Sequence, residues 1–183
     1  PSFAQCRGPR DVGFELTFGE GIGSPERTDI ANARCLVLIG SHLGENMHNT
    51  QVQEFAEAIA NDATIIVADP RFSIAASKAR HYLPVRPGTD LALLLAWMNV
   101  IVTEGLVNEE FIASRTIGYD ELRKNVEGYS PEAMAPICGI DADTIRDVAR
   151  LFATSKASMI LWGMGVSQHV HGTDNARCLI ALS

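Results

Sequence analysis

Four short turns in this chain combine glycine or proline with polar side chains, and each of them follows an apolar segment. They cover residues 40–46, 69–71, 86–90 and 163–168. Glycine lets a backbone approach a bulky ligand closely, and the start of a helix offers free N–H groups to anions. The turns therefore predict a loop-lined site for a phosphate-bearing ligand, and they leave the class of that ligand open.

Two side chains in the second turn suit such a ligand. Asp69 follows an apolar segment, where a carboxylate can accept from a ribose or a guanine, and Arg71 can bind a phosphate through two N–H groups. The alternative is a strand-ending turn with a surface ion pair. In the third turn, Thr89 or Asp90 either binds the ligand or only begins the following helix.

The elements that must position these turns are short apolar strands alternating with amphipathic helices. Strands are predicted at residues 35–39, 64–68, 81–85 and 158–162. Helices are predicted at residues 47–61, 90–104 and 141–154, with a further helix that holds Arg177. Nearly continuous apolar strands indicate a parallel sheet covered on both faces, with the ligand at the carboxyl ends of the strands. We therefore predict an α/β fold, a three-layer αβα Rossmann-like domain with a mainly parallel sheet.

Length and charge narrow the class of protein. The chain has 183 residues, 46% of them hydrophobic, and we expect one domain over residues 1–183. Residues 105–136 predict a helical excursion packed on the sheet edge, with helical pieces at residues 108–115 and 119–127 and a turn at residues 128–131. A net charge of -7 disfavours nucleic acid and anionic membranes as partners. The longest apolar runs fall short of the roughly 20 residues that cross a bilayer, which argues against direct membrane insertion.

The cysteines and the chain ends add two expectations. The four cysteines have no CxxC spacing, so they predict neither a zinc ribbon nor a local iron–sulfur site, and three of them are interpreted as packing residues: Cys35, Cys138 and Cys178. The chain begins without methionine and ends inside an apolar helical run, which predicts a piece of a longer protein. No G-x-G-x-x-G turn follows the first strand, and this disfavours an ordinary nicotinamide-binding domain.

The motifs also match a known family in order and spacing. The series CRGP, GSHLGEN, VADPR, VRPGTD and WGMGVSQ resembles the molybdopterin oxidoreductases of the dimethyl sulfoxide reductase superfamily, most closely formate dehydrogenase catalytic subunits. The segments RTIGYDELRKNVEGYSPE and LWGMGVSQHVHG extend the resemblance over essentially the whole chain. It implies a domain that holds one of two molybdopterin guanine dinucleotides, with molybdenum or tungsten at an interface with domains outside this chain.

The resemblance implies roles for three residues at the metal. Cys6 occupies the place of the metal ligand in CRGP, and a thiolate is a soft ligand suited to such a metal. Arg177 falls where formate dehydrogenases are expected to carry an arginine that orients a small anion. Arg7 replaces the histidine that formate dehydrogenases usually show after the ligand, and an arginine pair would also suit a sulfur or arsenic oxyanion.

Residues that would hold the dinucleotide follow from the same motifs. The resemblance implies contacts from ten positions: Gly40, Ser41, Glu45, Asp69, Arg71, Gly88, Asp90, Gly163, Met164 and Gln168. Four histidines beside the first and last turns are expected to line the pocket without binding a metal of their own: His42, His48, His169 and His171.

The function implied is two-electron redox chemistry on a small anion, as in formate dehydrogenase and in anaerobic respiration. Electrons would pass to a 4Fe-4S cluster in an N-terminal region outside this chain and on to an iron–sulfur subunit. The alternatives are a thiosulfate, polysulfide or arsenate reductase of the same superfamily, and, from another class, a non-catalytic cofactor-binding or structural domain. The resemblance points to a prokaryotic enzyme, in the cytoplasm or the periplasm, of which this piece alone should show no turnover.

Overall fold

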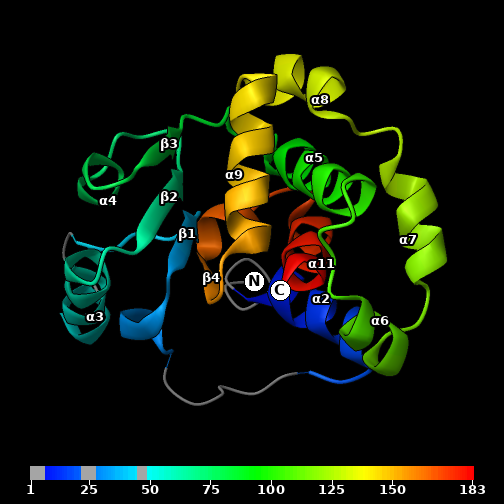
Figure 1. Cartoon of the computed structure of the whole chain (residues 1–183), viewed down its shortest axis with the longest axis horizontal. Helices are drawn as coiled ribbons and strands as arrows, with labels where there is room; N and C mark the ends of the chain where they lie inside the picture. Colours follow the sequence, from blue (N-terminus) through cyan, green and yellow to red (C-terminus); the bar gives the residue numbers. More distant parts are fainter. Residues whose placement is uncertain (1–6, 22–27, 45–48) are drawn as a thin grey trace.

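The computed structural model describes residues 7–21, 28–44 and 49–183. Within that part of the chain, four parallel strands form one sheet in the order β3-β2-β1-β4 (Figure 1). The strands are β1 Cys35–Ile39, β2 Thr64–Ala68, β3 His81–Leu83 and β4 Ser158–Trp162. Cys35 pairs with Thr64 on one side and with Ser158 on the other. The parallel sheet confirms the predicted α/β class.

Helices cover both faces of the sheet because successive strand residues point to opposite sides. On one face, Leu36, Leu38 and Val67 pack with η1 Ile30–Asn32, α3 Asn49–Ala60 and α4 Ile74–Ser77. On the other face, Val37 and Ile66 pack with α5 Asp90–Thr103, α9 Ala142–Thr154 and α11 Gly172–Leu182. Figure 1 shows α3 and α4 on one side of the strands and α5, α9 and α11 on the other. These are the three predicted layers.

The edge strand β3 is shorter than predicted. It ends at Leu83, whereas the sequence predicted a strand to Val85. Pro84 has no N–H to give to a ladder, and the Val85 N–H donates to the Leu83 carbonyl at 2.8 Å instead. The chain therefore turns away from the sheet here and leads toward the start of α5.

A second helical layer covers α5. It consists of α6 Glu109–Arg115, α7 Tyr119–Val126 and α8 Pro131–Cys138. Both α7 and α8 pack against α5, and α8 also packs against α9. The prediction had placed this excursion on the sheet edge, but most of its contacts are with helices, because α5 is buried on nearly all sides and needs cover away from the sheet. The end of α8 also contacts the loop after β3, where Arg86 Nη1 donates to the Pro136 carbonyl at 2.6 Å.

Helix α8 was missed in the sequence, where residues 128–131 were interpreted as a turn. The Ser130 hydroxyl accepts from the Ala133 N–H at 3.3 Å, and Pro131 occupies the first helical turn. Gly139 ends the helix in the left-handed region with φ 79°. The proline that suggested a turn is therefore part of a helix start.

Two further helices complete the architecture around the last turn. Helix α2 Gly8–Phe18 runs beside α11, and α10 Met164–Ser167 follows β4. A Cβ on Gly13 would lie 2.8 Å from Ala176 Cβ, and a Cβ on Gly172 would lie 3.0 Å from Pro9 Cβ. The two helices are therefore parallel and in close contact. None of the helices in the described residues combines the length and the apolar character needed to cross a membrane.

Helix α9 offers a direct test of local stability. The Asp141 carboxylate accepts from the Thr144 N–H at 3.1 Å and so caps the helix. Replacing Asp141 with alanine is expected to lower the free energy of unfolding by about 1 kcal/mol. Urea unfolding of this chain, followed by circular dichroism, measures the change. The matched control is Asp143→Ala, which removes only an exposed contact to Arg146 and is expected to cost less.

Candidate functional site

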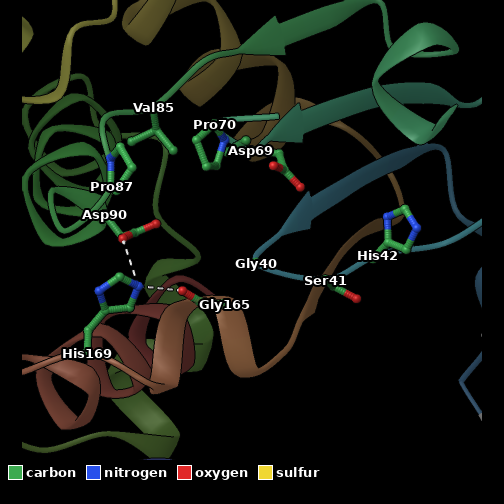
Figure 2. Close-up of a pocket in the computed structure, with 11 residues that line it drawn as sticks. Gly40, Ser41, His42, Asp69, Pro70, Val85, Pro87, Asp90, Gly165 and His169 are labelled. Atoms are coloured by element: carbon green, nitrogen blue, oxygen red, sulfur yellow. Dashed lines mark hydrogen bonds and ion pairs between the residues drawn. The ribbon is translucent and has the colours of Figure 1, made fainter. Parts of the chain in front are cut away.

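The four polar turns meet in one pocket at the carboxyl ends of the strands. The pocket has a volume of about 250 Å³ and is lined by eleven residues: Gly40, Ser41, His42, Ala68, Asp69, Pro70, Val85, Pro87, Asp90, Gly165 and His169 (Figure 2). Every turn contributes to it, from the loops after β1, β2 and β3 and from the segment that contains α10. β1 and β4 are neighbours in the sheet, and the chain leaves β1 toward α3 on one face and leaves β4 toward α11 on the other. Ligands bind at such a switch point in open α/β sheets.

The glycines after β1 and β4 allow two loops to touch each other. The Gly165 N–H donates to the Gly40 carbonyl at 3.0 Å. A Cβ on Gly165 would lie 2.5 Å from Gly40 Cα, and a Cβ on Gly163 would lie 2.9 Å from the Gly40 oxygen. Gly40 itself has φ 55°, which disfavours any side chain. These glycines were predicted to let backbone approach a ligand, which stays a prediction, and the structure shows that they also let the backbones of the two loops approach each other.

The loops after β1 and β2 are joined by polar contacts. The Asp69 carboxylate accepts from the Arg71 N–H at 2.7 Å, which fixes a tight turn with Asp69 on the pocket wall. Arg71 Nη2 lies 3.3 Å from His42 Nδ1. Because a guanidinium can only donate, Nδ1 of His42 accepts in this contact. Arg71 therefore contacts His42, which lines the pocket, but does not itself line the pocket.

Asp90 is the buried carboxylate of the site. Its residue is 6% exposed, at the first turn of α5. Burial raises the pKa of Asp90 above its ordinary value, while its own backbone N–H and the nearby His169 act in the opposite direction. His169 Nε2 lies 3.9 Å from Asp90 Oδ2 and 2.6 Å from the Gly165 carbonyl oxygen. Figure 2 shows both contacts leaving the same ring nitrogen of His169.

The polar groups of the pocket fit an organic ligand that carries N–H and O–H groups. Asp69 and Asp90 supply carboxylate acceptors, and Ser41 supplies a hydroxyl. The walls at Ala68 and Val85 are apolar, which suits a flat ring. Among the residues that the structure describes, no group of three or more His, Cys, Asp or Glu is placed to hold a metal ion.

Several residues predicted to bind the cofactor do not line this pocket. Gly88 is an exposed turn residue with φ 84°, and Gly163 packs behind Gly40. Gln168 is exposed, and its Nε2 lies 3.6 Å from Met164 Sδ, so these two side chains contact each other. Three predicted positions fall outside the described residues: Cys6, Glu45 and His48.

The two arginines predicted to act at the metal are not among the residues that line the pocket. Arg7 precedes α2, and its Nε donates to Asp11 Oδ2 at 2.8 Å. Arg177 is exposed in α11, where its backbone N is 3.6 Å from the place of a Cβ on Gly13. Their roles at the metal stay predictions.

The histidine predictions hold for two of the described positions. His42 and His169 line the pocket, whereas His171 is exposed at the start of α11. The sequence analysis did not assign Pro70, Val85, Pro87 or Gly165 to the wall. These residues lie in or next to the same four turns, which could have suggested them. The residue types in a turn do not show which of its residues face the pocket.

Comparisons with known proteins give the site its context. The family model for molybdopterin oxidoreductase matches residues 6–183. F420-dependent formate dehydrogenase subunit alpha of Methanocaldococcus jannaschii is 36% identical over 172 residues, which are 94% of this chain and 25% of that protein. Formate dehydrogenase H of Escherichia coli is 38% identical over 176 residues, 96% of this chain and 24% of that protein.

A solved structure agrees with these matches. Acetylene hydratase from Pelobacter acetylenicus superimposes with a TM-score of 0.86 at 31% identity, covering 99% of this chain and 24% of that one. The chain thus spans about a quarter of the length of the relatives it matches. The family resemblance inferred from the turn motifs is confirmed, and the chain belongs to the molybdopterin oxidoreductase family.

Proposed function

We propose that this chain is the part of a bis-molybdopterin guanine dinucleotide oxidoreductase that holds one pterin dinucleotide, and that the whole protein oxidises formate. The observation that carries the proposal is the convergence of four turns on one pocket with two carboxylates. The similarity to formate dehydrogenase subunits over more than nine-tenths of the chain supports the choice of substrate.

The residues of the pocket suit the dinucleotide end of this cofactor. A guanine presents two kinds of N–H donor on one edge, and Asp90 is a buried carboxylate that can accept from them. Asp69 can accept from a ribose hydroxyl, and Arg71, beside it, can bind a phosphate. The cofactor would supply a molybdenum or tungsten centre that exchanges two electrons with substrate.

Three residues are proposed to act at the metal on the basis of resemblance. Cys6 would ligate it, because it stands where the family carries its ligand. Arg177 and Arg7 would orient the anionic substrate. Electrons would leave through a 4Fe-4S cluster outside this chain and an iron–sulfur partner subunit, in anaerobic respiration.

A second candidate is the reduction of an oxyanion such as arsenate, or of thiosulfate or polysulfide. It is favoured by Arg7, which replaces the histidine expected in formate dehydrogenases and adds a positive charge next to the ligand position. A non-catalytic cofactor-binding domain is the outcome to expect if cofactor is present without any turnover.

The test uses the full-length protein purified without oxygen. Metal analysis and pterin fluorescence should show molybdenum or tungsten with bound pterin. Formate should then reduce a viologen dye. Reduced viologen oxidised by arsenate or thiosulfate, with no reaction toward formate, would establish the second candidate, and a protein without pterin would contradict both.

The carboxylate at the end of β2 provides a sharper test of the pocket. Asp69→Asn keeps an oxygen that can accept from the Arg71 N–H and removes the negative charge. We expect about tenfold weaker retention of the pterin, since hydrogen bonds to charged groups contribute about 1.5–3 kcal/mol. Pterin content after dialysis measures this. Asp120→Asn, on the exposed start of α7, is the control and should retain the wild-type content.

A further inference from the structure

The side chain of His169 connects its own segment after β4 with the start of α5, at one end of the pocket. His169, from the segment after α10, points its Nε2 at the Gly165 carbonyl oxygen at 2.6 Å and at Asp90 Oδ2 at 3.9 Å (Figure 2). A carbonyl oxygen can only accept, so Nε2 carries a hydrogen. The contact fixes the ring with this N–H edge toward the carboxylate that begins α5.

Asp90 depends on its neighbours for its charge. Burial raises the pKa of this carboxyl, and the named influences that lower it are its own backbone N–H and His169. Of the other charged groups nearby, Arg86 comes from the loop before α5, but its guanidinium donates to the Pro136 and Ile137 carbonyls at the end of α8. Asp69 and His42 lie on the loops after β2 and β1, farther along the pocket from His169 in Figure 2.

Arg71 does not replace the histidine in this role. Its guanidinium lies at His42, 3.3 Å from Nδ1, on the side of the pocket formed by the first two loops. Among the described residues, His169 is thus the side chain placed to put a positive charge next to Asp90.

We propose that His169 is a positioning residue that keeps the Asp90 carboxylate ionised and turned into the pocket, so that cofactor retention in acid depends on this contact. The inference rests on the proposed function, in which the pocket holds a guanine dinucleotide. An edge of N–H donors needs an ionised carboxylate as its acceptor, because a protonated carboxyl brings a competing O–H donor. Burial disfavours the ionised form of this acceptor, and His169, whose Nε2 lies 3.9 Å from Asp90 Oδ2, favours it.

The sign of the pH dependence follows from this arrangement. The ligand binds the ionised form of Asp90, so retention falls as the pH drops and Asp90 takes up a proton. His169 lowers the pKa of Asp90. Removing its charge moves protonation of Asp90 to higher pH, and cofactor is then lost under milder acid conditions.

The experiment measures cofactor release from the purified full-length protein over a series from mildly alkaline to mildly acidic pH. Released pterin is quantified by fluorescence. His169→Gln keeps an N–H donor for the Gly165 carbonyl and removes the charge, and we expect normal pterin content in mild alkali with release about tenfold faster in mild acid. His169→Lys restores a positive charge and should return the acid limb toward that of the wild type. His171→Gln makes the same change two residues on, at an exposed position, and should match the wild type.

Combining His169→Gln with Asp90→Asn shows whether the effect of the histidine on pterin release depends on the Asp90 carboxylate. Asp90→Asn does not titrate and should hold pterin more weakly at every pH, so release of the pterin that it carries should show no acid limb, and adding His169→Gln to it should change nothing further. A His169→Gln curve that overlays the wild type overturns the inference, and so does a shift that persists in the Asp90→Asn background. If the wild-type protein carries pterin and the His169 variants release it as the wild type does, the role of His169 is wrong and the proposed function stands. A wild-type protein without pterin overturns both.

Discussion

Replacing Gly165 with alanine is expected to lower the free energy of unfolding by about 3 kcal/mol and to release cofactor from the pocket proposed to hold it. The new Cβ would lie 2.5 Å from Gly40 Cα and 2.8 Å from the Gly40 oxygen, and both are backbone atoms that cannot rotate away. The loops after β1 and β4 must therefore separate. Gly40 and Gly165 both line the pocket, so the separation changes its wall directly.

Urea unfolding of this chain measures the first effect, and pterin content of the full-length protein measures the second. Gly128→Ala is the control, because Gly128 has no atom within 4 Å of the place of its Cβ. That exposed change should stay within about 0.5 kcal/mol of the wild type. An unchanged unfolding midpoint for Gly165→Ala would show that the two loops do not touch as described.

Replacing Cys6 with alanine is expected to reduce turnover by at least about 100-fold while leaving pterin in place. Changing a group that only supports a metal ligand already costs 10–100-fold in many metal sites, so losing a ligand should cost no less. The four turns that are proposed to hold the dinucleotide do not include Cys6, so pterin content should survive. Dye-linked turnover and metal content per protein are the two measurements.

The control for Cys6 is Cys178→Ala. Cys178 is partly buried against the helical core, and burial raises the pKa of its thiol to about 12, so it is an inert packing residue. That variant should keep its turnover. Retained metal with unchanged turnover in Cys6→Ala would refute the ligand assignment.

The two central strands, β1 and β2, were predictable because they are buried on both faces. Every residue of β1 is buried, so its sequence is an uninterrupted apolar run, and β2 differs only at Thr64. The order of such runs and the amphipathic helices between them was enough to predict a parallel sheet and a site at its carboxyl edge. Family motifs then narrowed the class of ligand.

The features that escaped prediction depend on contacts between distant segments. The contact of His169 with Asp90 requires the loops after β3 and β4 to lie close together, and the sequence of neither loop predicts this. The close approach of Gly165 to Gly40 also depends on how the loops after β1 and β4 pack, so the sequence of either loop alone does not show it. Helix α8 was hidden because Pro131 is compatible with both a turn and a helix start.

The parallel contact of α2 with α11 has a mechanical consequence. Pro9 rests against Gly172, and Gly13 against Ala176, so small residues meet at two successive levels of the helix pair. Sliding α2 by one residue would bring Val12 or Phe14 against Ala176, and no room exists there for a larger side chain. Gly172 comes three residues after His169, which lines the pocket. The close packing of α2 on α11 therefore couples the position of α2, which begins just after Cys6, to the position of that end of the pocket.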